Sequence, residues 1–312
     1  MCHEEGVLMN TNSHISKQYS ISFSGHDSFP LRHGWLEKAY KEVTEQLGAN
    51  PFTAEDSVVK FGVGKNMVRS IHYWLKSFAL IDDDDTATFY SEQLFKSTEG
   101  GDPYLENPAT LFILQYLLSS KEYASIYSLV FRDFFRNKAN QEFTELQVTT
   151  YIKRVLTELD IKKFNDNTIR SDFKVFVRTY VPPKKNLKTI EDDFSAPLLD
   201  LKLISDTGRK NDLNQPVYRI NKAVRPGLSE YAFAFCVLDF FEEEVAIDFT
   251  DIANNIGAFL CLTNEGLEEV LGRLCQSDKR FVFKSDAGVK QLQLKQNDLS
   301  LKEEMLNKIY SE

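Results

Sequence analysis

The chain has 312 residues, with 46 acidic and 37 basic side chains and a formal net charge of −9. A hydrophobic fraction of 42%, with 24 Phe and 13 Tyr, excludes a wholly disordered protein. No apolar run reaches the roughly eighteen residues of a membrane-spanning helix, and the N-terminus lacks the pattern of a secretory signal. The cysteines show no C-x-x-C spacing, which fits a reducing compartment. We therefore expect a cytoplasmic protein with no membrane association.

A chain of this length predicts about two or three modules rather than one core. We expect a flexible leader at residues 1–20, because this stretch is polar and aperiodic. An N-terminal winged-helix-like DNA-binding module is predicted at residues 21–101, a helical middle module with a basic helix at 102–227, and a C-terminal winged-helix-like module at 228–312. The predicted fold class is therefore mainly α, a multi-module helical protein whose winged-helix-like units carry short β-hairpins.

The first candidate site along the chain is the turn GHDSFP at residues 25–30, just before a predicted amphipathic helix. His26 on such a turn could act as a general base, and Asp27 lies beside it. Both are therefore candidate catalytic residues. The alternative is that the imidazole only hydrogen-bonds the neighbouring backbone.

The next segment, GVGKNMVRSIHYWLKSFALI at residues 62–81, predicts a helix with two chemically distinct faces. At about 100° per residue, one stripe is basic and imidazole-bearing: Lys65, Arg69, His72 and Lys76. The other stripe is apolar: Val68, Ile71, Leu75 and Phe78. A helix of this kind can lie in a DNA groove or against phosphates. The side chains expected to contact DNA are Lys65, Asn66, Arg69, Ser70 and Lys76. The alternative is an ordinary solvated surface.

The run GVGK within this segment is not a phosphate loop, because Val59 stands where the first glycine is needed and Asn66 replaces the hydroxyl residue. After the helix comes a run of four aspartates at residues 82–85, which we expect to stay solvated. The stretch TATFYSEQLFKS then nearly alternates in hydrophobicity, which predicts a hairpin wing.

A second basic helix is predicted in DNTIRSDFKVFVRTYV, where Arg170, Lys174 and Arg178 recur at four-residue steps. The following VPPKK adds Lys184 and Lys185. Residues 150–189 carry ten lysines and arginines against four carboxylates, although the whole chain is acidic. This imbalance predicts a second phosphate-contacting surface.

The C-terminal region predicts three helices, in EYAFAFCVLDFFE, DFTDIANNI and TNEGLEEVLGRLCQ, followed by a hairpin and a last helix, LSLKEEMLNKIY. The third of these helices carries Glu265, Glu268 and Glu269 where a DNA-reading helix would carry Lys or Arg. We therefore interpret this region as a protein-contact module.

Asp200 and Lys202, with Asp192 or Asp193, follow the acid, acid-x-Lys order of metal-dependent nucleases, in which carboxylates hold the metal and a lysine helps to activate water. Asp200 and Lys202 are therefore further catalytic candidates, although so short a match can arise by chance. A nicking enzyme of this type would use Mg²⁺ or Mn²⁺, and the sequence does not identify its metal ligands.

Taken together, the motifs resemble the bacterial domain-of-unknown-function family four thousand and seven, over residues 22–296. The similarity lies in FSGHDSFPLRHGWLEKAY, FGVGKNMVRSIHYWLKSFALI, DNTIRSDFKVFVRTYVPP, IEDDFSAPLLDLKLI and AGVKQLQL. Members of that family are encoded next to cysteine desulfurases and sulfurtransferase-like enzymes in DNA phosphorothioation and phage-defence operons. The resemblance implies DNA as the target, sulfur-transfer and ATPase proteins of the same operon as partners, and nicking as an activity. It transfers no catalytic residue.

The leading hypothesis is a DNA-binding component of a phosphorothioation or phage-defence system, with nicking for sulfur incorporation as an open question. One alternative is a non-catalytic adaptor that recruits the sulfur-transfer enzyme or ATPase. Another is a transcriptional regulator of the operon.

Overall fold

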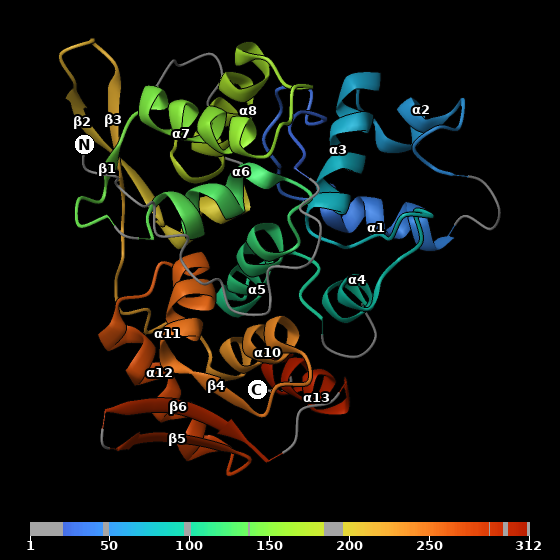
Figure 1. Ribbon diagram of the computed structural model, residues 1–312. Coiled ribbons are helices and arrows are strands. Elements are labelled where there is room, and N and C mark those ends of the chain that lie inside the picture. Colours follow the sequence, from blue (N-terminus) through green and yellow to red (C-terminus); the bar gives the residue numbers. More distant parts are fainter. Residues whose placement is uncertain are drawn as a thin grey trace.

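The structure is a computed structural model that describes residues 21–45, 50–96, 101–136, 138–183, 196–286, 288–295 and 299–310. It is mainly helical, as the sequence predicts, and it contains two small antiparallel sheets (Figure 1). The leader expected at residues 1–20 lies outside the described residues. Within the described part, no helix has both the length and the apolar character needed to cross a membrane.

The N-terminal unit consists of the helices α1 (Trp35–Glu45), α2 (Ser57–Phe61), α3 (Lys65–Ser77) and α4 (Phe89–Phe95). The predicted apolar stripe of α3 is confirmed, because all four of its members are almost completely buried. Trp74 is also buried, and its indole N–H donates to the carbonyl of Phe29 at 3.1 Å. This bond ties α3 to the chain segment that precedes α1.

The hairpin wing predicted after the aspartate run is wrong. Helix α4 occupies this place. Among the described residues there, strand-like pairing is limited to an isolated bridge between Ile81 and Ala87. The buried residues of α4 are Ser91, Leu94 and Phe95, which follow the i, i+3, i+4 spacing of a helix. The near-alternation of polar and apolar residues in this short stretch suited either structure, and packing favoured the helix.

The middle unit contains helices and a three-stranded sheet that the sequence analysis did not predict. Its elements are α5 (Pro108–Ser120), α6 (Ser125–Ser128), the π-helix η1 (Leu129–Phe134), β1 (Glu142–Phe143), α7 (Glu145–Glu158), α8 (Asp166–Tyr180), the 3₁₀ helix η2 (Pro197–Leu201), β2 (Ile204–Lys210) and β3 (Pro216–Ile220). Helix α8 begins at the predicted basic segment, where the Asn165 side chain accepts from the Thr168 N–H at 3.0 Å.

The C-terminal unit follows the predicted order of helices, hairpin and final helix. Its elements are α10 (Glu230–Phe241), β4 (Ala246–Asp248), α11 (Phe249–Ile252), the π-helix η3 (Ala253–Gly257), α12 (Asn264–Ser277), β5 (Phe281–Asp286), β6 (Val289–Leu294) and α13 (Leu299–Tyr310). Strand β4 adds a third strand to the expected hairpin.

The middle and C-terminal units share a sheet topology: a first strand, then helical segments, then a hairpin whose second strand pairs with the first strand. The sheet orders are β1-β3-β2 and β4-β6-β5. Helix α12 directly precedes the β5–β6 hairpin, whereas the 3₁₀ helix η2 lies between α8 and the β2–β3 hairpin. The buried apolar residues of all units form one continuous cluster, so the units are packed together.

A buried carboxylate joins helices from all three units. Asp239 of α10, with a side chain 2% exposed, accepts hydrogen bonds from the hydroxyls of Tyr90 in α4 and Tyr116 in α5, both at 2.7 Å. The ammonium groups of Lys121 and Lys302 lie 2.7 and 2.9 Å from its oxygens. Burial alone would raise the pKa of Asp239, but the attraction of Lys121 and Lys302 and the hydrogen bonds outweigh it and lower this pKa to about 2.

We expect Asp239→Asn to lower the free energy of unfolding by about 3–5 kcal/mol at pH 7, because two lysines lose their buried counter-ion. The folded pKa of Asp239 lies below its ordinary value of 3.8. The stabilisation is therefore complete above about pH 5 and is lost as the pH falls toward about 2. Urea unfolding of both proteins between pH 7 and pH 3 should show the difference shrinking in acid. The exposed Asp212→Asn is the matched control, and an equal effect of the two substitutions would contradict this role.

Candidate nucleic-acid interface

A loop at residues 24–29 lies between α3 and α8, where Figure 1 shows the blue N-terminal segment passing between these helices. Gly25 has a φ of +100°, and a Cβ there would lie 2.6 Å from Cδ2 of Tyr73 in α3. Only glycine fits this position without displacing the tyrosine ring. The loop is therefore packed directly onto α3.

The same loop is bonded to α8 through Asp172, which is 1% exposed. Both carboxylate oxygens of Asp172 accept from the Ser24 N–H, at 2.9 and 3.1 Å. His26 Nε2 lies 3.2 Å from Asp172 Oδ1, a close contact whose direction does not make it a hydrogen bond. The Ser28 N–H donates to His26 Nδ1 at 3.0 Å, which places the proton of a neutral ring on Nε2, facing the carboxylate.

This arrangement decides between the two interpretations of His26. The side chain is 4% exposed and both ring nitrogens face groups of the protein. A catalytic base must reach its substrate, and this imidazole instead shapes the loop. The expectation that His26 is an accessible base is therefore corrected, and the hydrogen-bonded alternative describes it.

Consecutive loop residues hold arginines from the two basic helices. The Arg69 Nε–H of α3 donates to Asp27 Oδ2 at 2.8 Å, and its Nη2 donates to Asn66 Oδ1 at 3.1 Å. The Arg178 Nη1 of α8 donates to the carbonyl of Ser28 at 3.2 Å. The loop thus brings the two predicted basic surfaces together.

Two of the residues predicted to contact DNA from α3 do not face outward. Ser70 is completely buried, because it lies on the same side of the helix as Trp74 and Ser77. The Lys76 side chain is 10% exposed, lies 2.8 Å from Asp85 and donates to the carbonyl of Asp82. The expected DNA contacts of Ser70 and Lys76 are therefore wrong.

The aspartate run explains why the C-terminal half of the α3 stripe is neutralised. It folds back on the helix, so that Asp85 also lies 2.6 Å from His72 Nε2. Burial acts to raise the pKa of Asp85, but the hydrogen bonds from His72 and Lys76 outweigh it and lower the pKa. The run was expected to stay solvated, and Asp85 instead balances the charge of Lys76.

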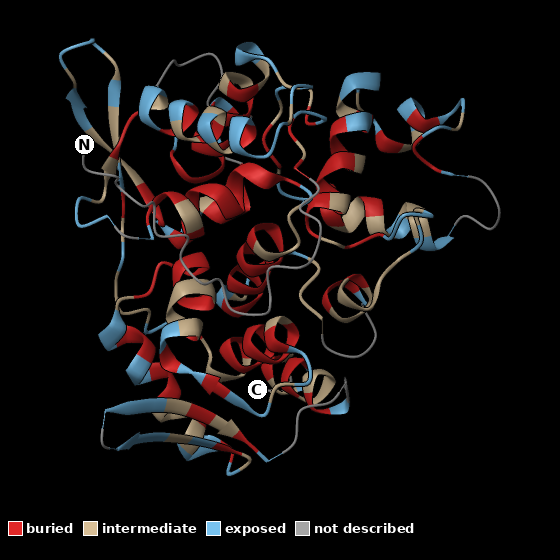
Figure 2. Cartoon of the chain, viewed as in Figure 1, coloured by how far each residue is buried: buried red, intermediate tan, exposed pale blue. Residues whose placement is uncertain are grey.

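The remaining predicted cations form an exposed face. Lys65, Asn66 and Arg69 are exposed at the N-terminal half of α3, and Lys174 and Arg178 are exposed on α8. Figure 2 shows that the molecule has exposed and buried stretches on the same helices. Among the described residues, Lys65 and Lys174 have no ion-pair partner. Arg170 is paired with Glu145 at 2.5 Å, and Lys184 and Lys185 lie outside the described residues. We call Lys65, Asn66, Arg69, Lys174 and Arg178 the basic face.

A groove of about 440 Å³ lies between α8 and strand β3, and Lys174, Arg178 and Tyr218 are among the residues that line it. The adjoining hairpin adds exposed Arg209 and Lys210, which the sequence analysis missed. The polar residues Asn211, Asp212 and Asn214 between two β-forming segments were a signal that could have revealed this hairpin. Gly208, with a φ of +74°, lies inside β2, where the strand pairing is irregular.

Asp200 and Lys202 lie elsewhere, in a groove of about 740 Å³ also lined by His33, Glu106 and Arg225. His26 and Asp27 do not line this groove, so the four catalytic candidates fall into two separate places. Among the described residues, no three His, Cys, Asp or Glu side chains are grouped so that they could hold a metal ion. The structure therefore identifies no ligand set for the expected Mg²⁺ or Mn²⁺ among the described residues, and Asp192 and Asp193 lie outside them.

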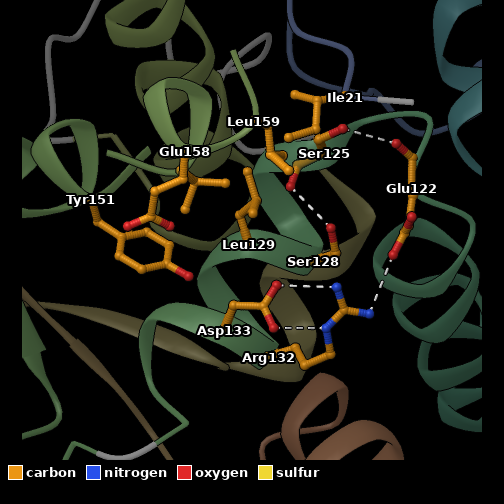
Figure 3. A pocket seen from close by; sticks show the side chains of 11 residues that line it. Ile21, Glu122, Ser125, Ser128, Leu129, Arg132, Asp133, Tyr151, Glu158 and Leu159 are labelled. Atoms are coloured by element: carbon orange, nitrogen blue, oxygen red, sulfur yellow. Dashed lines mark hydrogen bonds and ion pairs between the residues drawn. The ribbon is translucent and has the colours of Figure 1, made fainter. Parts of the chain in front are cut away.

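A third pocket, of about 170 Å³, is mostly apolar and none of the predicted site residues lines it (Figure 3). Its buried cation, Arg132, lies 3.2 Å from Glu122 and 2.9 Å from Asp133, so its charge is balanced. The pocket offers no side chain in a catalytic arrangement, and we do not assign it to the site.

Asp172→Asn should lower the free energy of unfolding by about 2–3 kcal/mol, because an amide replaces the buried charge that accepts the Ser24 N–H. Asp166→Asn on the same helix is the control. Asp166 is 62% exposed and pairs with Lys153, so its loss should cost less than about 1 kcal/mol. Chemical denaturation of both variants measures this difference, and equal losses would show that Asp172 does not anchor the loop.

Comparison with known proteins places the chain in a family. No curated protein matches it. It is similar to a magnesium ion-bound crystal structure of SspB, with a TM-score of 0.79 and 25% identity, and to a second SspB crystal structure, with a TM-score of 0.78 and 24% identity. Each comparison covers 93% of this chain and 88% of the SspB chain. The family described as "Protein of unknown function (DUF4007)" matches residues 23–310, and the chain belongs to this family, as its motifs predicted.

Proposed function

We propose that this protein binds duplex DNA through the basic face, as a component of a bacterial DNA phosphorothioation system. The observation that carries the proposal is that one loop joins two cationic helices at a single exposed surface. The link to phosphorothioation is supported by the family resemblance and by the likeness to SspB. Lysine and arginine side chains supply most of the affinity for phosphates, and the Asn66 amide can contact phosphates or base edges.

The order of elements in the middle unit supports α8 as the DNA-reading helix. In winged-helix proteins the recognition helix comes before the hairpin that forms the wing, and α8 is the last α-helix that the described residues show before β2–β3, with the 3₁₀ helix η2 between them. Helix α12 holds the same place in the C-terminal unit, where Glu265, Glu268 and Glu269 would repel phosphates. We therefore propose two winged-helix-like units with different partners, DNA for the middle unit and protein for the C-terminal one.

The charge of the whole chain makes the basic face the decisive part of this proposal. A net charge of −9 repels DNA at long range. Binding then depends on local cations and should weaken steeply with salt. An adaptor that recruits a sulfur-transfer enzyme or ATPase would not need this face. Measuring DNA binding at increasing salt concentration therefore separates an adaptor from a DNA-binding component.

The double charge reversal Lys65→Glu and Lys174→Glu should weaken duplex DNA binding by at least about tenfold at low salt, and should reduce the slope of log K against log salt by about 2. Fluorescence anisotropy with a short duplex at several salt concentrations measures both quantities. The matched control reverses Lys284 and Lys295, which are exposed at the C-terminal hairpin. Equal losses from the two pairs would contradict a localised DNA surface.

Nicking is a second candidate function, favoured by the groove that contains Asp200 and Lys202 together with His33 and Glu106. Histidine and carboxylate side chains are the usual groups for proton transfer, and a lysine can stabilise a phosphate. The described residues identify no metal ligands in this groove, so the proposal assigns roles to these side chains alone.

We expect Asp200→Asn or Lys202→Ala to abolish relaxation of supercoiled plasmid, assayed in buffer with added Mg²⁺, because the groove would lose a base or a phosphate-binding cation. The charge reversal at Lys284 serves again as the control for net charge. If the unmodified protein leaves the plasmid supercoiled, nicking is wrong and DNA binding alone, as in a regulator, describes the protein.

A further inference from the structure

The carboxylate of Asp27 lies beside the basic face, where phosphates should approach. Asp27 is 29% exposed and pairs with Arg69, which is 57% exposed. A negative charge at this place should weaken the attraction for DNA. Its hydrogen bond with the exposed Arg69 suggests a benefit that offsets this repulsion.

We propose that Asp27 is a positioning residue, which fixes the Arg69 guanidinium so that Arg69 and Arg178 together grip one phosphate backbone. This inference rests on the proposed DNA-binding function. Asp27 acts through Arg69 and does not itself contact DNA, so it is not a catalytic residue.

The hydrogen bonds of Arg69 leave donors for a phosphate. An arginine side chain has five N–H groups in a planar fork. The structure uses its Nε–H for Asp27 and one Nη2–H for Asn66, while the Nη1 hydrogens remain available. Because the guanidinium group is planar and rigid, holding its Nε–H against Asp27 also sets the direction in which the Nη1 hydrogens point.

The loop itself is held in a single conformation. Asp27 and Ser28 have φ values of 44° and 65°, in the left-handed region that non-glycine residues rarely adopt. The hydrogen bonds that the Ser24 N–H donates to Asp172 and the close packing of Gly25 on Tyr73 hold this turn. The turn directs the Asp27 carboxylate to Arg69 of α3 and the Ser28 carbonyl to Arg178 of α8. The turn thereby holds Arg69 of α3 and Arg178 of α8 at a fixed spacing, as the proposed grip on one phosphate backbone requires.

The substitution Asp27→Asn distinguishes a role of Asp27 in positioning Arg69 from a purely electrostatic effect of its negative charge. Simple electrostatics predicts tighter DNA binding, because the variant loses a negative charge beside the phosphates. Positioning predicts weaker binding, by about threefold to tenfold, because an amide holds the guanidinium less firmly than a carboxylate. Asp56→Asn is the control, since Asp56 is 55% exposed and pairs with Lys60 away from the loop. This control should bind DNA within about twofold of the unmodified protein.

A double-mutant cycle with Arg69→Lys completes the experiment, with short-duplex anisotropy as the readout and thermal unfolding as a check that each variant is folded. Lysine keeps the charge but loses the planar fork. In the Arg69→Lys background, Asp27→Asn should no longer weaken binding.

Tighter binding by Asp27→Asn alone would overturn the positioning role, and so would an equal loss in both backgrounds. Either result leaves the proposed DNA binding standing if the Lys65 and Lys174 reversals still weaken it. If those reversals have no effect, the proposed function itself fails, so the two failures are distinguishable.

Discussion

The position of the basic face depends on the buried carboxylate of Asp172. This side chain lies inside the protein at the point where the N-terminal segment passes between α3 and α8, and it accepts the Ser24 N–H with both oxygens. A buried charge is stable only where such partners meet it, so the loop must run along α8 in this place. The His26 ring and the Tyr73 ring then complete the packing of the loop against α3. The spacing of the exposed arginines follows from this buried contact.

The cluster around Asp239 connects helices of the three units to one another. It connects a tyrosine of α4, a tyrosine of α5 and a lysine of α13 to one carboxylate of α10. Together with the continuous apolar core, it restricts movement of the units relative to each other. The DNA surface that we propose on α3 and α8 requires such rigidity, because the two helices belong to different units.

The sequence predicted those features that depend on local periodicity. The apolar stripe of α3, the exposed cations of α8 and the helices and hairpin of the C-terminal unit all have strong patterns over their own lengths. It could not predict contacts between distant segments. Lys76 looked free because nothing local shows that Asp85 folds back on it. Ser70 lies at the border of the polar and apolar stripes, and only the packing around Trp74 decides its burial. The pairing of Asp27 with Arg69 likewise joins residues 42 positions apart.

The central claim is that the loop at residues 24–29 unites two basic helices into one DNA-binding face. Hydrogen–deuterium exchange of the full chain, with and without a short duplex, tests it most directly, because protection reports where the ligand lies. The account predicts slower exchange in this loop, at the N-terminal end of α3, in α8 and in the β2–β3 hairpin, with the β5–β6 hairpin unchanged. Protection confined to the C-terminal unit, or absent from the loop and α8 at saturating DNA, would contradict it.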